Sequence, residues 1–484
     1  MKKAFSLTIG IVAISFSLLG CNNQKGVNSN SKGNNRSNIV SLDIVAFNDF
    51  HGNTLDSDTG LGLAKTTSLI NELTNHSNNR LLISQGDMWQ GSAESNLTHG
   101  NLVTDWMNDQ GFASMTLGNH EFDWGQDDII NNEKMANFPF LGINVYSTET
   151  NSLVSYCKPS TIAKIGSAKI GIIGAIGDCY SSISSSQVKD IYFKVGDELT
   201  SLVKAEAKSL KEQGCDFIIY SIHDDDSAYN LELSDGYVDL VLEGHTHKNY
   251  IRKDAKGVYH VQGGGYNKSL PYISLNIDIA KDTYEVKKIQ SIYTNDHTKL
   301  EENAKAKELF DKYQDVIGNV RTPIGTNSSR RDSDFLRRLV SELYLEAGLE
   351  KWKDQYNIFL GGGYISCRSP YYLPSGDVSY ADLYNLFPFD NDIQLCSVSG
   401  YYLLKQFINT NNDNYFISYS EYGEGLVNSV ENNATYYIVT DSYCSDYGPN
   451  NLTVVDTYDR DCYYARDLLK DYIINGGLDN KITM

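Results

Sequence analysis

The sequence has little positive charge, and this shortage limits the partners that the protein can bind. Its 41 Lys and Arg stand against 61 Asp and Glu, which gives a formal net charge of −20 over 484 residues. Proteins that hold long nucleic acids neutralise phosphates with a basic face, and docking on anionic lipid needs a basic patch. We therefore expect no long nucleic acid as a partner and no membrane contact through surface charge.

Cysteine is also scarce, because the chain has only eight, too few for a scaffold built from disulfides. None forms a Cys-x-x-Cys pair, so a thiolate metal site is not predicted. Setting Cys21 aside leaves an odd number, and small buried apolar side chains are the plainest expectation. Cys444–Cys462 and Cys367–Cys396 are both conceivable disulfides, and the spacing does not choose between pairings.

Long apolar runs are absent except at the N-terminus. After two lysines, residues 4–19 are mostly apolar, which is short for a membrane span and suits a secretory signal. This segment ends in Leu18-Leu19-Gly20-Cys21, which resembles the lipoprotein box of bacteria. An ordinary secretory signal with a chance cysteine is the alternative.

The lipoprotein resemblance has consequences for location. In that family the signal is cut before the cysteine, which then carries lipid, so it implies a signal peptide over 1–20 and lipidation of Cys21. Residues 21–39 are rich in Asn, Ser and Gly and predict a flexible tether. We expect a bacterial lipoprotein of the cell envelope, outside the cytoplasm, that contacts the membrane through its lipid anchor only.

Short apolar runs rich in Val and Ile recur from residue 39 to about 275. Several are too continuous for strands with one exposed face, so we expect interior strands covered on both sides. Helical patterns alternate with them, as at 61–75, 100–111 and 196–213. This alternation is typical of layered α/β architecture. The apolar runs are 39–47, 81–84, 113–117, 170–177, 217–222, 238–242 and 258–262.

The character of the chain changes beyond this region. Residues 298–318 are polar with apolar positions at helical spacing, which predicts a helix that bridges two domains. After Pro323 come a helical stretch at 333–348, a glycine run at 361–363 and many tyrosines. We place a second domain at about 321–484.

Metal-competent side chains follow closely on the predicted strands. Ligands of open α/β sheets bind outside the carboxyl ends of the strands, so these side chains can converge on one pocket. Taken singly, each is more simply a structural residue or a turn. Their joint order predicts one site, and it includes five of the nine histidines. The set is Asp49, His51, Asp87, Asn119, His120, Glu121, His223, His245 and His247.

These ordered motifs resemble those of calcineurin-like metallophosphatases. More narrowly, they are similar to the secreted 5′-nucleotidase family, which includes UDP-sugar hydrolases and 2′,3′-cyclic-nucleotide phosphodiesterases. The resemblance covers about 42–484 and implies an α/β (α+β) fold. Its parts would be a four-layer αββα metallophosphatase sandwich over 40–295, a linker helix over 296–320, and a smaller α/β substrate-recognition domain over 321–484.

The resemblance implies two divalent metal ions as cofactors. Nitrogen and oxygen ligands suit Zn, Mn, Fe or Co, and the sequence does not choose among them. Two metals about 3.5–4 Å apart clamp a phosphate ester, and a metal-bound hydroxide attacks phosphorus. The implied ligands are Asp49, His51, Asp87 and His247 for one ion, and Asp87, Asn119, His223 and His245 for the other, with Asp87 bridging.

His120 is not a metal ligand in the family. It is expected to face the phosphate, where it stabilises charge and helps the leaving oxygen depart. Asp123, three residues later, would orient and polarise His120. A surface carboxylate at the start of a helix is the alternative interpretation of Asp123.

The second domain matches the family only in part. The resemblance makes Phe389 a ring that stacks on the base, Asn391 its neighbour, and Arg330 a phosphate contact. The family's Asn-Gly-Gly-Gly-x-Arg motif is altered here, because Leu360 and Ile365 replace its Asn and Arg.

Two further substitutes are predicted in this domain. Arg368, three residues beyond Ile365, is the candidate for the missing arginine. The family's Gly-Gly-Asp-Gly segment is absent, and Tyr443 or Tyr447 is the candidate for the second ring. Ordinary packing is the plainer interpretation of any one tyrosine in a chain that contains 34.

Three functions remain open on the sequence alone. The first is a dinuclear-metal phosphoesterase that hydrolyses extracellular nucleotides, as 5′-nucleotidases do. The second applies the same chemistry to 2′,3′-cyclic nucleotides, UDP-sugars or a non-nucleotide phosphate ester. The third is a surface binding lipoprotein with a structural metal site, which His120 and Asp123 disfavour because a scaffold has no use for them. The oligomeric state is not predicted.

Overall fold

The computed structural model describes residues 39–57, 60–75, 79–225, 236–368, 370–446, 448–458 and 464–480. The predicted signal, the tether and the lipidation site at Cys21 lie outside these residues. Tyr447 and Cys462 also lie outside them.

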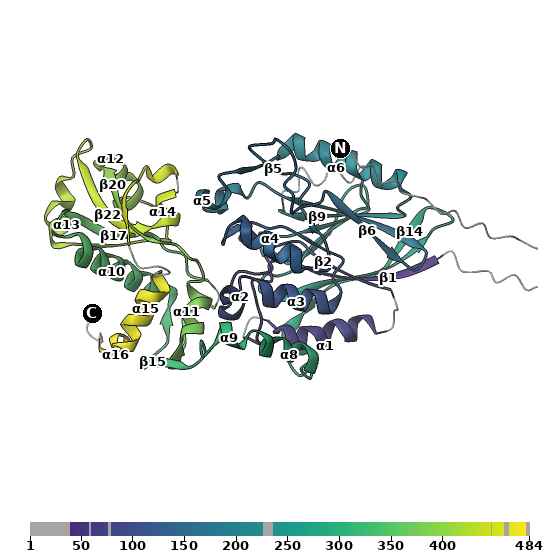
Figure 1. Cartoon of the computed structure of the whole chain (residues 1–484), viewed down its shortest axis with the longest axis horizontal. Helices are drawn as coiled ribbons and strands as arrows, with labels where there is room; N and C mark the ends of the chain where they lie inside the picture. The colour runs from purple at the N-terminus through teal and green to yellow at the C-terminus, as the bar shows by residue number, and fades with distance from the viewer. Residues whose placement is uncertain are drawn as a thin grey trace, which may run out of the picture. The chain divides into compact units, whose positions relative to one another are not determined.

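A six-stranded sheet contains the N-terminal strand of the described chain (Figure 1). Its strands, in order across the sheet, are β14 (Thr283–Tyr293), β13 (Ser269–Asp278), β1 (Ile39–Phe47), β2 (Arg80–Ser84), β3 (Ser114–Thr116) and β4 (Phe140–Leu141). Strands β1 to β4 are parallel, whereas β13 and β14 extend the sheet in antiparallel pairs on the other side of β1. The carboxyl ends of β1, β2 and β3 therefore lie at one edge.

A second six-stranded sheet also combines parallel and antiparallel strand pairs. Its order is β11 (Tyr250–Lys253), β12 (Tyr259–Gln262), β10 (Leu240–Glu243), β9 (Phe217–His223), β7 (Ala168–Ile176) and β6 (Ser160–Ile165). The four central strands are parallel, and β11 and β6 close the two edges in antiparallel pairs. The prediction from apolar runs found the central strands and missed these edge strands.

The two sheets share one buried core. Alternate side chains of a strand point to opposite faces, and β1 shows the consequence. Leu42 and Ile44 pack in the same cluster as Ile219 of the second sheet, whereas Val45 and Phe47 pack in a separate cluster under helices. Both faces of β1 are covered, which is why its sequence is apolar almost throughout.

Helices cover the outer faces of both sheets. Trp106 of the helix 101–110 packs with Phe47, and Val203 of the helix 196–212 packs with Ile218. The predicted four-layer αββα fold class is thereby confirmed. The helices of this part are α1 (Leu63–Thr74), α2 (Ala93–Leu97), α3 (Asn101–Gln110), α4 (Gln126–Met135), α5 (Ser185–Val188) and α6 (Gly196–Glu212). A small antiparallel pair joins β5 (Val145–Ser147) and β8 (Ile191–Phe193).

The segment predicted as one linker helix forms two short ones. Helix α8 (Ala304–Lys312) is followed, after Tyr313, by α9 (Gln314–Ile317). The Tyr313 hydroxyl donates to Asp105 Oδ2 of α3 at 2.6 Å, and the ring joins the core that contains α1 and α3. The segment is therefore anchored on the first sheet's helices, and the anchor at Tyr313 is where the helix breaks.

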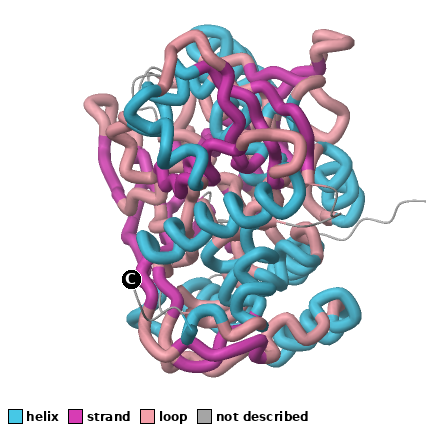
Figure 2. The backbone as a smooth tube through the Cα atoms, turned by 90° about the vertical axis from the view of Figure 1, so that its left-hand side faces the viewer, coloured by secondary structure: helices cyan, strands magenta, loops and turns pink. Residues whose placement is uncertain are grey.

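The C-terminal part has its own five-stranded sheet (Figure 2). Its order is β21 (Tyr415–Tyr419), β17 (Ile358–Tyr364), β22 (Thr435–Asp441), β20 (Ile393–Ser399) and β23 (Thr453–Thr457). Its helices are α10 (Ser333–Trp352), α11 (Tyr380–Leu386), α12 (Gly400–Tyr402), α13 (Glu421–Leu426), α14 (Ser442–Asp446), α15 (Ala465–Ile474) and α16 (Gly477–Asn480). Two small pairs join β15 (Pro323–Asn327) to β19 (Gly376–Ser379), and β16 (Arg331–Asp332) to β18 (Tyr372–Leu373).

The glycine run belongs to the packing of this sheet. Gly361 to Gly363 lie in β17, directly beneath α10. A Cβ at Gly361 would meet the backbone nitrogen of Leu345 at 2.4 Å, so a larger residue would push the helix away. The flanking Leu360 and Ile365 are buried among apolar side chains.

The six cysteines in the described part of the chain are buried free thiols. Cys367 and Cys396 belong to clusters on opposite faces of the C-terminal sheet, so the conceivable bridge between them is not formed. Cys444 is a free thiol, and its conceivable partner Cys462 lies outside the described residues. The expectation of small buried apolar side chains is confirmed for these six.

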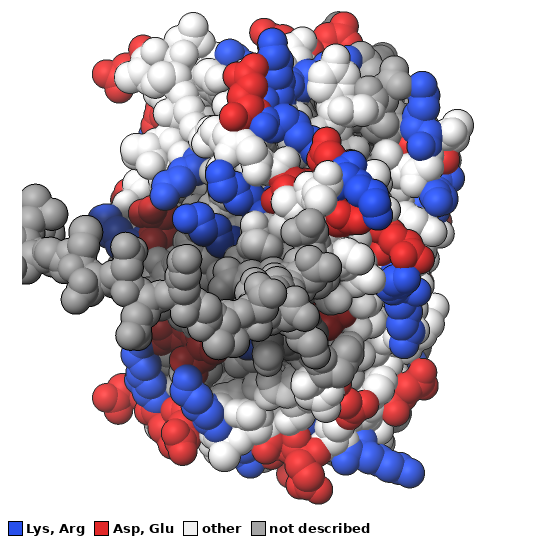
Figure 3. Space-filling model, turned by 90° about the vertical axis from the view of Figure 1, so that its right-hand side faces the viewer, with Lys and Arg blue, Asp and Glu red and all other residues white. Residues whose placement is uncertain are grey.

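Charge is mixed on the surface that Figure 3 shows, where Lys and Arg alternate with Asp and Glu over the described residues. Exposed pairs such as Lys281–Asp278, at 2.8 Å, illustrate the mixing. Among the described residues, no helix is long and apolar enough to cross a membrane.

Candidate active site

Five of the seven candidate metal ligands lie on loops that leave the strands with unusual backbone geometry. Asp49, His51, Asp87, His245 and His247 have φ values of 50°, 50°, 55°, 75° and 57°. The left-handed region is sparsely populated by residues other than glycine, and such strain collects at functional sites where the surrounding structure enforces it. These turns direct the side chains back over the carboxyl ends of β1, β2 and β10.

The structure brings six of the predicted ligands into two groups. Within each group the donor atoms lie within 4.8 Å of one another. Asp49, His51 and His247 form the first, and Asp87, His223 and His245 form the second. In the first group, Nε2 of His51 lies 3.0 Å from Nε2 of His247, which lies 3.4 Å from Oδ1 of Asp49.

Asp87, a member of the second group, also lies close to the first group. Its Oδ2 is 3.2 Å from Nε2 of His223 and 4.0 Å from Nε2 of His51. Asn119 Oδ1 completes the second group, 3.1 Å from Nε2 of His223 and 2.9 Å from Nδ1 of His245. All seven predicted ligands are thus adjacent, in an arrangement compatible with a bridging Asp87. Their individual roles stay predictions.

Backbone carbonyl groups orient two of the histidines. Nδ1 of His51 lies 3.0 Å from the carbonyl oxygen of Gln90, and Nδ1 of His223 lies 2.7 Å from that of Gln85. Each Nδ1–H donates to its carbonyl, which directs Nε2 at the carboxylates and leaves it available to a metal ion once it has lost any proton. Metal-binding histidines are held in this way in many proteins, so the donor set fits a pair of divalent ions.

The electrostatics of this cluster favour cations. Burial would raise the pKa of Asp49, but hydrogen bonding and charge from His247 lower it to about 2. Burial would lower the pKa of His223, but the charge of Asp87 raises it to about 10. Burial and the charge of His247 hold the pKa of His51 well below its usual value. The buried carboxylates thus attract positive charge, which a metal ion supplies better than a proton.

Glu121 holds the Asp87 turn, a role that the sequence did not assign although the residue stands in a recognised motif. Its buried carboxylate accepts backbone N–H groups of Asp87, Met88 and Gly118 at 2.7–2.8 Å. Burial and the charge of Asp87 raise its pKa to about 7. Three hydrogen bonds from two loops fix the bridging position.

His120 lies beside the ligand groups, in a short helical turn over 120–122. Its Nδ1–H donates to Asp123 Oδ2 at 2.8 Å, and Arg368 Nη2 donates to its Nε2 at 2.9 Å. Burial would lower the pKa of His120, but the charges of Asp123 and Asp87 raise it, against the opposing charge of Arg368. The predicted His120–Asp123 pair is therefore formed.

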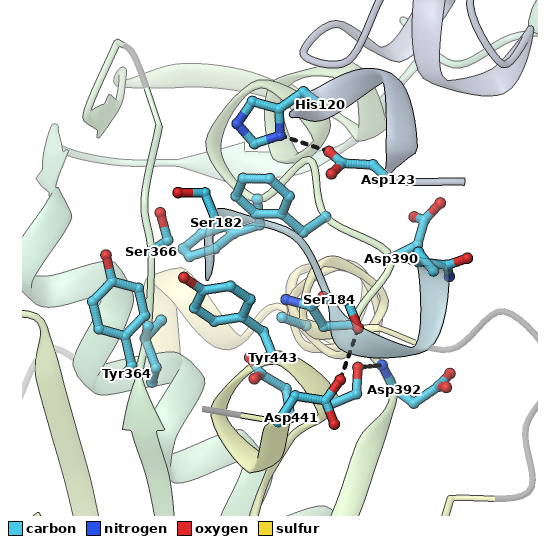
Figure 4. A pocket seen from close by; sticks show the side chains of 18 of the residues that line it. His120, Asp123, Ser182, Ser184, Tyr364, Ser366, Asp390, Asp392, Asp441 and Tyr443 are labelled. Carbon is cyan, nitrogen blue, oxygen red and sulfur yellow. Dashed lines mark hydrogen bonds and ion pairs between the residues drawn. The ribbon is translucent and has the colours of Figure 1, made fainter. Parts of the chain in front are cut away.

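A cavity of about 400 Å³ opens from these residues (Figure 4). Phe389, Asn391, Arg368 and Tyr443, which the sequence predicted as substrate contacts, line it together with His120. The ring of Phe389 lies 5.6 Å from the ring of His120, and Tyr443 lies 5.7 Å from Tyr364. The cavity thus joins the metal-competent residues to an aromatic region.

Arg330 is not among the residues that line this cavity. It is exposed, and its guanidinium stacks 3.9 Å above the ring of Tyr372. The structure therefore gives no support to the phosphate contact predicted for Arg330, because its guanidinium packs on Tyr372 instead. Tyr447 lies outside the described residues.

Comparison with known proteins gives this arrangement a family. The family model for calcineurin-like phosphoesterases matches residues 42–249. Residues 42–249 are a calcineurin-like phosphoesterase domain. All seven candidate metal ligands, His120 and Asp123 belong to this phosphoesterase domain.

Individual relatives extend beyond the phosphoesterase domain. The chain is 26% identical over 406 residues to "Endonuclease YhcR" of Bacillus subtilis, covering 75% of this chain and 32% of that protein. It is 24% identical over 449 residues to a "5′-nucleotidase" of Vibrio parahaemolyticus, covering 80% and 77%. The chain therefore spans about a third of the length of the first relative and about three quarters of the second.

A solved structure supports the fold of the whole described chain. The 5′-nucleotidase precursor from Thermus thermophilus superposes with a TM-score of 0.68 at 18% identity, covering 90% of this chain and 97% of that chain. The predicted family, metallophosphatases of the 5′-nucleotidase type, is confirmed by these similarities.

Several residues that hold the wall of this cavity in place were missed from the sequence. The buried guanidinium of Arg466 binds the Asp390 carboxylate and donates to the Phe389 carbonyl at 2.9 Å, which holds the predicted stacking ring in place. Ser184 donates to Asp446 Oδ2 at 2.8 Å across the cavity (Figure 4). No local pattern marks such residues, because each contact joins segments far apart in the sequence.

Proposed function

We propose that the chain is a metal-dependent phosphoric ester hydrolase that acts on nucleotides, as 5′-nucleotidases do. The observation that supports this most directly is the shared cavity. Members of both ligand groups, the His120–Asp123 pair and Phe389 all border one space of about 400 Å³. The members of the ligand groups that line it are Asp87, His245 and His247. That space is large enough to enclose a small organic ligand.

The residues of the site would divide the work. The two ligand groups would hold two divalent ions, which when bound activate water and neutralise charge on a phosphate. Asp123 fixes the tautomer and orientation of His120. To protonate the oxygen that leaves phosphorus, Nε2 of His120 must carry a proton in place of the hydrogen bond that it accepts from Arg368, so a bound phosphate would have to draw the Arg368 guanidinium to itself. Positioned proton transfer of this kind typically contributes about 10²- to 10⁴-fold in rate.

The substrate proposal rests on the aromatic region. Phe389, Tyr364 and Tyr443 line the cavity and offer rings on which a nucleobase can stack. Stacking of a base on an aromatic ring contributes about 1–3 kcal/mol. The similarity to the 5′-nucleotidase of Vibrio parahaemolyticus supports the proposal of a nucleotide substrate.

Hydrolysis of other esters remains the second candidate. Leu360 and Ile365 replace the polar residues of the family motif and are buried, so the nucleotide contacts of this chain differ from those of the family. Cyclic nucleotides, UDP-sugars and non-nucleotide esters are therefore included in the test.

The metal identity and the location are further proposals. Zn, Mn, Fe and Co all suit the nitrogen and oxygen donors of the two groups. We propose an extracytoplasmic lipoprotein attached through Cys21, and Cys21→Ser should move the protein from the membrane fraction to the soluble fraction. An unchanged distribution would refute the anchor.

The decisive experiment measures product release with and without a chelator. The substrates are nucleoside monophosphates, 2′,3′-cyclic nucleotides, UDP-sugars and a simple aryl phosphate, each tested with Zn, Mn, Fe and Co. We expect metal-dependent turnover that is highest on a nucleoside monophosphate. Absence of metal-dependent turnover on every substrate of the panel would refute the proposed hydrolase function and favour a binding lipoprotein.

A further inference from the structure

A second cavity, of about 260 Å³, borders the same centre from another side. It is lined by His51, Gln90 and Tyr266 of the first part and by Asn385 and Tyr372 of the C-terminal part, among others. The first cavity is lined by His120, His245 and His247 instead. We call these the His120 cavity and the Gln90 cavity.

The two cavities meet at the candidate metal centre. Arg368 lines both, and His51 of the Gln90 cavity lies 3.0 Å, between Nε2 atoms, from His247 of the His120 cavity. A phosphorus atom held at the centre would therefore have a separate space on each side. A monoester carries one organic group and fills only one of these spaces.

The wall of the Gln90 cavity contains a buried hydrogen-bond donor without a partner among the described residues. Gln90 is 1% exposed, and its Nε2 makes no hydrogen bond within the described chain. Buried polar groups are almost always hydrogen-bonded, so an unpaired buried amide on a cavity wall indicates a bound ligand or water. The rings of Tyr266 and Tyr372 supply apolar faces in the same wall.

Apart from Arg368, which lines both cavities and so lies where they meet, the charged groups around the Gln90 cavity already have partners. Asp56 binds Lys65 at 2.6 Å, and Arg321 binds Glu94. Asp382 accepts hydrogen bonds from the backbone and hydroxyl of Ser379 at 2.8 and 2.7 Å. Arg368 can face a phosphate held between the two cavities, and the rest of the Gln90 cavity offers no free counter-ion among the described residues that line it. A neutral group with hydroxyls could accept from Gln90 there and pack on the tyrosines.

We propose that the Gln90 cavity is a subsite for a second ester group on phosphorus, which is neutral and bears hydroxyls. The centre then accepts acyclic phosphodiesters as well as monoesters. This inference rests on the proposed hydrolase function and adds a substrate class and an orientation to it.

The orientation follows from the position of His120, which lines only one of the cavities. The alkoxide that leaves phosphorus needs a proton, and His120 can supply it only to the group in its own cavity. Water therefore adds to phosphorus, the P–O bond to the group in the His120 cavity breaks, and that group departs as an alcohol. The group in the Gln90 cavity stays on phosphorus as a monoester.

The test uses two substrates with the same nucleoside, adenosine 5′-monophosphate and its glyceryl ester, with metal-loaded enzyme in ¹⁸O-water. The first should give adenosine and phosphate. The second should give adenosine and glycerol phosphate that carries ¹⁸O on phosphorus. Release of glycerol and adenosine monophosphate, or no reaction of the diester while the monoester is hydrolysed, would overturn the inference alone.

The remaining outcomes separate the two proposals. Hydrolysis of the diester to adenosine and glycerol phosphate without hydrolysis of the monoester would leave the inference standing and refute the monoesterase. If neither substrate reacts with the metal-loaded enzyme, both proposals are wrong.

A variant that fills the Gln90 cavity tests the subsite directly. Asn385 is half-buried in its wall, and Asn385→Trp should lower the ratio of diester to monoester kcat/KM at least tenfold. Asn432→Trp, at an exposed turn outside both cavities, is the matched control and should leave the ratio unchanged. A ratio that is unchanged in a folded Asn385→Trp protein would contradict the assignment.

Binding measurements provide a readout that does not depend on turnover. Calorimetry should show glycerol phosphate binding at least tenfold more weakly to Asn385→Trp than to the unmodified protein, relative to inorganic phosphate. Gln90→Ala, which removes the unpaired donor without filling space, should also weaken glycerol phosphate relative to phosphate. Equal losses for both ligands would show that the cavity holds only water and would overturn the subsite.

Discussion

Asp441 offers a prediction whose sign and size follow from its surroundings. The carboxyl group lies at the end of β22, in the wall of the His120 cavity, and is 6% exposed. Burial raises its pKa from 3.8 to about 6, although the backbone N–H of Cys444 and the hydroxyl of Tyr344 oppose the shift by donating to it at 2.9 and 3.1 Å.

The shift makes the folded state less stable as the pH rises. Between pH 3.8 and about 6 the unfolded chain has released this proton, whereas the folded chain still holds it. The contribution of Asp441 to the free energy of unfolding is therefore fully present below the unfolded pKa of 3.8 and is lost as the pH rises through the folded pKa of about 6. Two pKa units correspond to about 3 kcal/mol.

Asp441→Asn removes the titration while keeping an oxygen that can accept from Cys444. The variant should gain free energy of unfolding, relative to the unmodified protein, by up to about 3 kcal/mol between pH 4 and pH 7.5. Urea unfolding, followed by fluorescence at five or six pH values across this range, measures the difference. The pH dependence of the difference is the test, because a loss of packing in the variant would change its free energy of unfolding by the same amount at every pH.

Two outcomes would refute the argument. A difference that is constant from pH 4 to pH 7.5 would show that Asp441 is not the titrating group, and a difference that falls with pH would reverse the sign. Tyr344→Phe serves as a companion, because loss of its hydrogen bond should raise the pKa of Asp441 further and move the pH-dependent loss of stability to higher pH.

Three substitutions in and around the site give separate readouts. His120→Ala should keep its metal, measured by elemental analysis, and lose about 10²- to 10⁴-fold in turnover, so near-full activity in a metal-loaded protein would contradict its role. Glu121→Gln should weaken metal affinity about 10- to 100-fold in a metal titration, because one backbone N–H of the Asp87 turn loses its acceptor; unchanged affinity would refute the support that we assign to it. Arg466→Ala should raise KM for a nucleotide several-fold more than it lowers kcat, because Asp390 and the neighbouring ring lose their anchor; equal changes in the two constants would argue against that anchor.

The positions of the candidate ligands could be predicted because the signals are local. Apolar runs buried on both faces identified β1, β7 and β9, and the polar residues directly after such runs had to lie at the carboxyl ends of parallel strands. The order of the motifs then added the family. In these elements, a short stretch of sequence contains all the information that the prediction needs.

The parts that could not be predicted depend on contacts between distant segments. β14 has mostly partly exposed or exposed side chains and no continuous apolar run. The break at Tyr313 follows from its contact with α3, and Arg466 is defined by Asp390, 76 residues away. The place of Arg330 outside the His120 cavity has the same origin, because proximity to a helix start in the sequence does not determine which cavity that start faces.

The glycine run in β17 shows that helix packing and polar contacts in the cavity are separate requirements, although one sequence motif contains both. Its first glycine serves the contact between α10 and the sheet, where a Cβ would strike the backbone of Leu345. Leu360 and Ile365, before and after the run, contribute apolar side chains to the core, and Arg368 lines the cavity. The architecture can thus keep its glycines while its polar contacts change place, and a motif match at the glycines reports on helix packing and not on what the cavity holds.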